Sequence, residues 1–353
     1  MKLKYKLGVA AFALIAFTSC EVNDPFSDIM EVGQPVPTVY WSISSTVVDA
    51  GDNIEFSGKY YTDKDHTPDH AEIWETVVNN ETATVTLGAL TSSLKYSQTV
   101  NVVDTVRTSL TATYPHSLAK WNGTEWQLDN SFPVSQTLKS VKWANIKVWD
   151  QKKFNDYYPA NFEEEFLTAV YDYLINNSTY LNDLRSVYIG YDFTAEQFAA
   201  INAAHAGYEL PTVTDSGEKS DQWVVNTENV VAKYWIEIVG EGDSKTKIEH
   251  VVSLEQAAAD TSKNYYDVYE SPKWVFCRYD DDKGAIVTTL VAEYAPVFTD
   301  LIKLIPFTSW ILTEDNTYNV DFSRQYKINY TFKVVDTAGN VGYTTDNKEV
   351  TIN

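Results

Sequence analysis

The sequence predicts a mainly β protein with a smaller α+β part, in which an N-terminal β-sandwich at residues 37–150 is followed by an α+β domain at 151–353. Short β-rich segments recur at intervals of about ten residues up to residue 149, a spacing typical of sandwiches. Helical periodicity with capping signals then appears, and β-rich segments return after Pro211. A chain of 353 residues is long enough for two domains of ordinary size.

The first domain consists of alternating or β-branched segments divided by turn residues. The expected strands are 38–43, 53–61, 71–74, 82–87, 94–100 and 141–149. Asn122-Gly123 supplies the two positive φ angles of a type I′ turn, so it predicts a hairpin between Trp121 and Trp126. The segment 47–58, VVDAGDNIEFSG, resembles the opening of immunoglobulin-like and PKD-like modules, which implies an immunoglobulin-like sandwich.

Helices are expected in the middle of the chain. The segment 161–164, NFEE, has the pattern of a capping box, and an apolar stripe follows over 162–174. A second capping pattern at 194–197, TAEQ, opens an alanine-rich helix. One further short helix is expected at 253–260.

The C-terminal part returns to strands. The expected strands are 230–238, 274–279 and 285–291. The segment 326–343 resembles the last hairpin of a bacterial immunoglobulin-like domain, with DTAGN at 336–340 forming the turn. This hairpin either closes the second domain or pairs back onto the first, and the sequence leaves both arrangements open.

The N-terminus has the layout of a secretory signal. Lysines at positions 2, 4 and 6 precede an apolar run at 7–17, which is too short to span a bilayer. The segment FTSC at 17–20 resembles a bacterial lipobox, and the acidic residues that follow resemble surface lipoproteins of the Bacteroidota. The resemblance implies a signal peptide at 1–19, acylation of Cys20, a tether at 20–36 and anchoring to the outer membrane, facing the cell exterior. An ordinary signal peptide with a chance cysteine, or an uncleaved anchor, is the alternative to the lipoprotein, and the periplasmic face is the alternative to the cell exterior.

Charge and cysteine content exclude several classes of partner and chemistry. The formal net charge is −22, so we expect no nucleic-acid partner and contact with the membrane through the lipid anchor only. The second cysteine, Cys277, lies in the aromatic and β-branched run 273–279 with no histidine close in sequence. This setting predicts a buried, unreactive thiol.

Sequence signatures of enzymes are missing, so no enzymatic activity is expected. The chain has no G-x-S-x-G elbow, P-loop, H-E-x-x-H, paired C-x-x-C or dinucleotide glycine fingerprint. A hydrolase stays open as an alternative, because the chain holds 49 carboxylates and a catalytic pair is defined in space rather than in sequence.

One acidic segment has the composition of a cation site. Asp63, Asp65 and Asp69 alternate with His66 and His70, and carboxylate oxygens at alternating positions are suited to calcium. No other cofactor is expected. The alternative is a solvated loop between two strands.

Aromatic residues near turns are the candidate ligand-binding groups. The chain has ten tryptophans and 24 tyrosines, and exposed rings of this kind stack on sugars or hold peptides. Trp121, Trp126, Tyr157 and Tyr158 lie beside predicted turns or loops, where binding residues concentrate. A role in the core is the alternative for each.

The lipobox, the acidic leader and the sandwich-like ends together resemble the accessory surface lipoproteins of starch-utilisation-type nutrient uptake systems. This resemblance implies non-covalent binding of a glycan or oligopeptide and its transfer to an outer-membrane transporter complex. A structural or adhesive protein that mediates protein–protein contact is a second class that the sequence allows, and a glycan or peptide hydrolase is a third.

Overall fold

The computed structural model describes residues 36–353 except 63–64, 114–119, 122–125, 242–243 and 345–346. For 112–113, 120–121 and 126–130 only the backbone is described. The predicted signal peptide, Cys20 and the tether up to residue 35 lie outside the described residues. Among the residues that the structure describes, strand (42%) exceeds helix (26%), which confirms a mainly β protein with an α+β part. No helix in the described ranges is long and apolar enough to cross a membrane.

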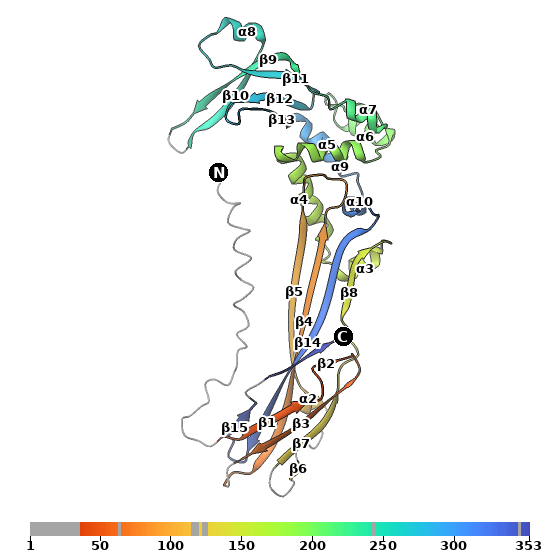
Figure 1. Cartoon of the computed structure of the whole chain (residues 1–353), viewed down its shortest axis with the longest axis vertical. Helices are drawn as coiled ribbons and strands as arrows, with labels where there is room; N and C mark the ends of the chain where they lie inside the picture. Colours follow the sequence, from red (N-terminus) through yellow and green to blue (C-terminus); the bar gives the residue numbers. More distant parts are fainter. Residues whose placement is uncertain (1–35, 63–64, 114–119, 122–125, 242–243, 345–346) are drawn as a thin grey trace. The chain divides into compact units, whose positions relative to one another are not determined.

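The chain forms two compact units whose segments alternate along the sequence (Figure 1). The described residues of the first unit are in 36–78, 105–138 and 327–353, and those of the second are in 79–104 and 139–326. The observed units therefore differ from the predicted division near residue 150. The C-terminal segment belongs to the same unit as the N-terminal strands.

The first unit contains β-strands almost exclusively. Its elements are β1 (Thr38–Ile43), β2 (Val47–Val48), β3 (Asn53–Tyr61), α2 (Leu110–Thr113), β6 (Lys120–Trp121), β7 (Trp126–Pro133), β15 (Val341–Tyr343), β16 (Lys348–Ile352) and parts of β4 (Pro68–Thr86), β5 (Ser97–Ser109) and β14 (Tyr318–Asp336). One sheet has the order β1-β3-β7-β6. The other follows the path β2-β16-β14-β4-β5, with β8 (Val141–Ile146) and β15 also paired to β14.

Alternating aromatic side chains pack these two sheets against each other in the first unit. Phe56 of β3 contacts Tyr330 of β14, with ring centroids 4.9 Å apart. Trp41 of β1 contacts Phe332 of β14 at 6.0 Å. Residues at alternate positions of a strand share a face, so each strand supplies one apolar face to this core. The sheets thus meet face to face, and the immunoglobulin-like strand arrangement stays a prediction.

The predicted DTAGN turn is confirmed. The Asp336 carboxylate accepts hydrogen bonds from the backbone N–H of Ala338 at 2.9 Å and of Asn340 at 2.8 Å. Gly339 has φ +85°, a conformation that glycine adopts without strain. The chain then enters β15 and returns along β14. Finally, β16 pairs in parallel with β2, so the last strand of the chain joins the sheet that contains the second strand.

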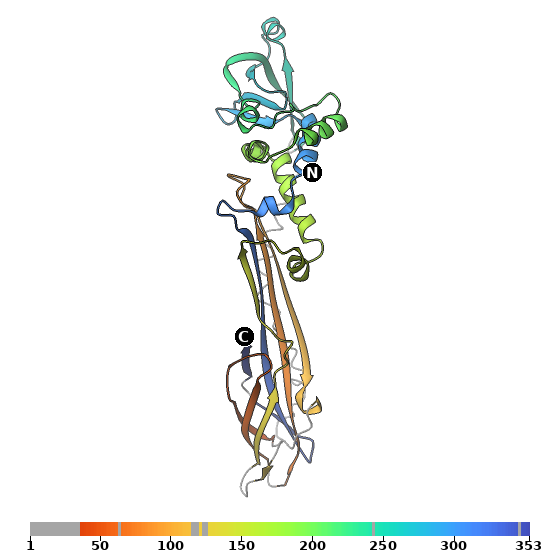
Figure 2. The ribbon, with the colours of Figure 1, turned by 90° about the vertical axis from the view of Figure 1, so that its right-hand side faces the viewer.

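The second unit combines helices with an antiparallel sheet. Its helices are α3 (Gln151–Tyr157), α4 (Phe162–Asn176), η1 (Ser178–Tyr180), α5 (Leu181–Gly190), α6 (Ala195–Ala204), α7 (Ser216–Asp221), α8 (Leu254–Ala259), η3 (Ala292–Tyr294), α9 (Ala295–Ile302) and α10 (Phe307–Ile311). The five-stranded sheet contains β9 (Asn226–Val239), β10 (Thr246–Val252), β11 (Tyr266–Glu270), β12 (Val275–Asp280) and β13 (Ala285–Leu290). Figures 1 and 2 show α5, α6, α7 and α9 gathered near β13.

The capping predictions have different outcomes. The box at Thr194 and Gln197 is confirmed, because both reciprocal hydrogen bonds form at the start of α6. Ser253 opens α8 with a similar box. Asn161 precedes α4 as predicted, but its side chain makes no capping hydrogen bond. Its amide donates to the Glu165 carboxylate instead, so the predicted box at 161–164 is wrong although the helix is present.

Aromatic contacts fix the helices of the second unit to its sheet. Trp274, which precedes β12, contacts Tyr188 of α5 and Phe298 of α9, with centroids 6.5 and 6.2 Å apart. Phe298 and Tyr188 are fully buried. The sheet is therefore held at its β12–β13 side, and its β9–β10 hairpin carries many of the exposed side chains.

Candidate functional site

The predicted ligand-binding aromatics do not form one site in the described structure. Tyr158 is only 4% exposed, stacks on Phe154 with centroids 4.4 Å apart, and donates a hydrogen bond to the Thr84 carbonyl at 3.0 Å. Its prediction as a ligand contact is wrong, because its ring is packed in the core against Phe154. Tyr157 is half-buried and stacks on Phe322 at 4.4 Å, so one face of its ring is covered.

The predicted hairpin at the other two aromatics is present in the backbone. Trp121 of β6 pairs with Trp126 of β7 in antiparallel register. The side chains of both residues lie outside the described part of the structure, so their predicted contact with a ligand stays a prediction.

Two of the three aspartates of the predicted cation site lie in the described part of the structure. Asp63 lies outside the described residues, Asp65 is exposed, and Asp69 is bonded to His70 at 2.7 Å. Nε2 of His70 lies 3.1 Å from a Glu72 oxygen. Among the residues with a described position, no three His, Cys, Asp or Glu side chains are grouped so that they could hold a metal ion. Calcium binding stays an untested expectation.

A different set of residues forms a concave surface on the five-stranded sheet of the second unit. The strand order is β10-β9-β11-β12-β13, and every neighbouring pair is antiparallel. Although β9 and β11 separate β10 from β12 in that order, Glu249 of β10 accepts a hydrogen bond from Arg278 of β12 at 2.7 Å. Lys247 of β10 pairs with Asp282 beyond β12. These contacts require the sheet to curl.

The curled sheet is organised around Arg278. Its guanidinium donates to the Tyr234 hydroxyl at 3.1 Å and lies 3.2 Å from Asp280. Tyr234 is fully buried, and its hydroxyl donates to the Tyr279 carbonyl at 2.7 Å. The planar guanidinium can bind several acceptors at once, so it ties β9, β10 and β12 together.

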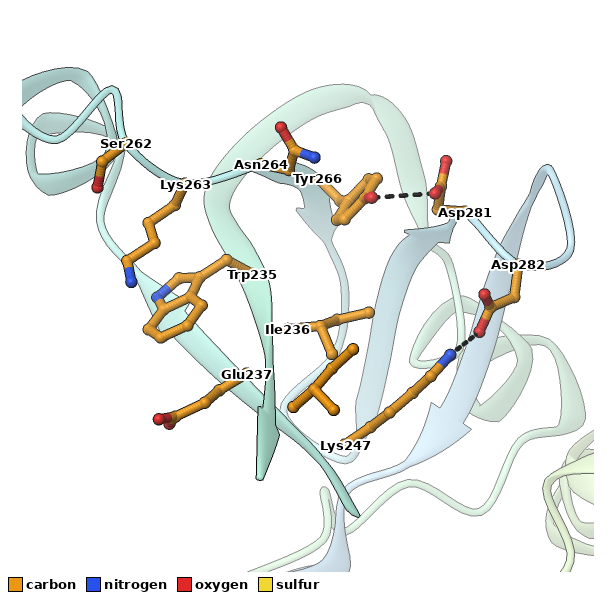
Figure 3. Close-up of a pocket in the computed structure, with 11 residues that line it drawn as sticks. Trp235, Ile236, Glu237, Lys247, Ser262, Lys263, Asn264, Tyr266, Asp281 and Asp282 are labelled. Atoms are coloured by element: carbon orange, nitrogen blue, oxygen red, sulfur yellow. Dashed lines mark hydrogen bonds and ion pairs between the residues drawn. The ribbon is translucent and has the colours of Figure 1, made fainter. Parts of the chain in front are cut away.

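A hollow of about 530 Å³ opens over this sheet (Figure 3). Its lining residues are Trp235, Ile236, Glu237, Ile238, Lys247, Ser262, Lys263, Asn264, Tyr266, Asp281 and Asp282. They come from β9, β10, the segment between α8 and β11, the start of β11 and the turn after β12. The volume falls within the range typical of small-ligand sites.

One side of β9 presents an ordered indole ring to the hollow. Trp235 stacks on His250 of β10, its partner in register, with centroids 4.4 Å apart and an interplanar angle of 17°. Lys263 places its ammonium nitrogen 4.1 Å from the centroid of the same ring. His250 Nε2 lies 2.7 Å from Glu237, which shares the face of Trp235 because it is two residues along the strand.

The other side of β9 presents apolar and charged groups together. Figure 3 shows Ile236 on the opposite side of the strand from Trp235. The Tyr266 hydroxyl donates to Asp281 at 3.0 Å, and this hydrogen bond raises the pKa of the tyrosine. The hydrogen bond and charge of Lys247 hold the pKa of Asp282 below its usual range. Asp282 is therefore ionised at neutral pH, and the hydrogen bonds of Asp281 and Asp282 fix their orientation.

The chemical capacity of this arrangement is non-covalent recognition. The indole ring offers an apolar π-face, Asn264 and Ser262 are polar groups able to hydrogen-bond, and fixed carboxylates offer acceptors. Cys277 contributes nothing to it, because its side chain is fully buried in β12 and burial raises the pKa of its thiol. The predicted burial of Cys277 is confirmed.

The sequence contained a signal for this site that the prediction did not use. Residues 230–238 were expected to form a strand, and Lys233, Trp235 and Glu237 fall on one face of any strand in that register. A tryptophan flanked on its own face by two charged residues indicates a solvent-facing position. The partners His250 and Lys263 could not be found in this way, because their approach to Trp235 depends on the hairpin register and on the segment before β11.

Comparison with known proteins adds little to this description. No family model and no curated protein match the chain. Among solved structures, the sporulation control protein Spo0M from Bacillus subtilis aligns over 29% of this chain and 36% of that chain, with 9% identity and a TM-score of 0.12. The alignment thus spans little more than a third of that protein, and a likeness this small carries no argument about fold or function.

Proposed function

We propose that this protein binds a small polar ligand, a glycan or an oligopeptide, non-covalently in the hollow over the five-stranded sheet. The observation that supports the proposal most is the indole of Trp235, which is held by His250 beside a hollow with polar and charged lining groups. An aromatic ring fixed before binding loses little entropy when a ligand stacks on it. The role needs no bond breaking.

The proposed cellular setting comes from the N-terminal sequence. The lipobox-like segment ending at Cys20 supports an acylated lipoprotein on the outer membrane. In this setting the protein acts as an accessory to a transporter complex and passes the captured nutrient to it. The net charge of −22 keeps the protein away from anionic lipid surfaces, so that the lipid anchor makes the membrane contact.

Calorimetric titration of the purified full-length protein in detergent tests the proposal. We expect a saturable heat with one ligand class from a panel of neutral and charged oligosaccharides and short peptides. Trp235→Ala should weaken that binding by about ten-fold or more, the cost of losing one buried stacking contact. Tyr40→Ala is the matched control, because Tyr40 is an exposed aromatic of the first unit. Equal affinity of Trp235→Ala and wild type would contradict the proposed site.

A second function, adhesion through protein–protein contact, is favoured by one observation. The hairpin strands carry exposed aliphatic side chains at Val231, Ile238, Val239, Ile248 and Val251. Exposed apolar groups gathered on one element are typical of a surface that docks a partner. Cross-linking on intact cells tests this alternative: Val251→Lys, on an exposed residue of β10 outside the lining of the hollow, would abolish a cross-linked complex formed through the hairpin and leave small-ligand binding in place.

A further inference from the structure

The ammonium group of Lys263 lies over the ring of Trp235. Its nitrogen lies 4.1 Å from the ring centroid, and the imidazole of His250 stacks on the same ring with centroids 4.4 Å apart. An ammonium over an indole is attracted by the negative face of the ring. The ring is therefore already bound to a cation, and that cation belongs to the chain itself.

Contacts of Lys263 with the rest of the site are few. Within the described residues, no carboxylate lies within ion-pair distance of its nitrogen. Its positive charge interacts with Asp260, whose carboxylate is held by the hydroxyl and backbone N–H of Ser262 at 2.6 and 3.0 Å. Lys263 is exposed and lies in the segment between α8 and β11. Lys263 can therefore leave the Trp235 ring at a small cost in free energy.

The surroundings favour a cation in this place over an anion. Glu237 lies on the same face as Trp235 and is fixed by His250. The other two lining carboxylates, Asp281 and Asp282, are bonded to Tyr266 and Lys247 on the other side of β9, so Glu237 is the lining carboxylate that shares the face of Trp235. The protein as a whole carries a net charge of −22, which raises the local concentration of cations around it.

We propose that Lys263 is an internal placeholder for a cationic group of the ligand. The ligand presents an ammonium, from a lysine side chain of a peptide or from an amino sugar, which displaces Lys263 and takes its position over Trp235 beside Glu237. This inference rests on the proposed function, since it names the ligand chemistry of the same hollow. The inference predicts that removal of Lys263 raises the affinity for the ligand, since the lysine no longer competes for the ring.

The test is calorimetric titration of the full-length protein with two pairs of probes. The peptide Gly-Lys-Gly is compared with Gly-Leu-Gly, and the glucosamine dimer with the N-acetylglucosamine dimer. We expect at least one charged probe to bind more tightly than its neutral counterpart, and the pair that responds identifies the source of the ammonium. Lys263→Ala should raise the affinity for that probe about three-fold, the contribution of one exposed cation–π contact that no longer competes.

Two further variants control the result. Lys303→Ala removes one positive charge from an exposed position at the end of α9 and should leave the affinity unchanged. Trp235→Phe keeps an aromatic face and should retain part of the preference for the charged probe, whereas Trp235→Ala should abolish it.

The outcomes separate this inference from the function on which it rests. A loss of affinity in Lys263→Ala, or equal binding of charged and neutral probes, would overturn the placeholder while ligand binding in the hollow stands. If no probe and no member of the wider panel binds to wild type or to Lys263→Ala, the proposed function itself is wrong and the inference falls with it.

Discussion

Two buried tyrosines of the second unit differ in whether their hydroxyl groups have partners. The Tyr158 hydroxyl donates to the Thr84 carbonyl, whereas the Tyr188 hydroxyl is buried with no hydrogen-bond partner among the described residues. Burial raises the pKa of both. The Tyr188 ring instead makes edge contacts with Phe198, Trp223 and Phe298. Its ring stabilises the core, while burial of its hydroxyl costs desolvation energy that no hydrogen bond within the described residues offsets.

The same substitution should therefore have opposite effects at these two positions. Tyr158→Phe should lower the free energy of unfolding by about 1 kcal/mol, because the Thr84 carbonyl loses its donor. Tyr188→Phe should leave it unchanged or raise it by up to about 1 kcal/mol, because an unpaired hydroxyl is removed. Urea unfolding of both variants measures the difference. Destabilisation of Tyr188→Phe to the same extent as Tyr158→Phe would show that the hydroxyl has a partner.

At the scale of elements, one carboxylate connects α5 to the loop between β4 and β5. Asp183 is fully buried and accepts hydrogen bonds from the backbone N–H groups of Ser92, Ser93 and Leu94, at 2.5, 2.7 and 2.9 Å. Burial raises the pKa of Asp183, but these bonds together with that from the Ser93 hydroxyl outweigh it and leave the pKa below its ordinary value.

We expect Asp183→Asn to lower the free energy of unfolding by about 3 kcal/mol, because an amide presents one acceptor oxygen and one donor to a cluster of donors. Chemical denaturation measures the loss, and Asp172→Asn, at an exposed position of α4, is the matched control. The depressed pKa means that the wild-type contribution is fully present above the unfolded-state pKa of about 4 and disappears as the pH falls through the lower folded-state pKa. The wild-type advantage over Asp183→Asn should thus shrink in acid. A pH-independent difference would contradict the charged acceptor.

Local signals in the sequence predicted elements well where the determinants are close in the chain. The capping box at Thr194 and the Asp336 turn form as expected, since each depends on fewer than about six residues. The long strands were harder. The sequence predicted separate strands at 71–74 and 82–87, yet β4 runs through both, and the Arg324 guanidinium of β14 lies 2.5 Å from the Glu81 carboxylate between them. A neighbouring strand supplies the partner that local propensity cannot show.

At the scale of the whole molecule, pairing between distant segments decides where the C-terminal hairpin belongs. The sequence allowed it to close the second domain or to pair back onto the first, and the structure places it in the first unit. Backbone N–H groups of Thr351 and Asn353 donate to the carbonyls of Thr46 and Val48 at 2.9 and 3.0 Å, which joins the last strand to the second. The composition predicted a mainly β chain with helices, and this is confirmed. The candidate site was not predicted, because its sheet is curled, as the contact of Arg278 with a strand that is not its neighbour shows. Such a contact leaves no periodic pattern in the sequence.

The central claim is that ligand binding takes place at the hollow beside Trp235. Hydrogen–deuterium exchange of the full-length protein, with and without a ligand identified by calorimetry, tests it most directly. We predict slower exchange in β9, β10 and residues 260–266, with unchanged exchange in the first unit. Protection confined to the first unit, or to helices α3 and α4, would contradict the account and place the binding site elsewhere.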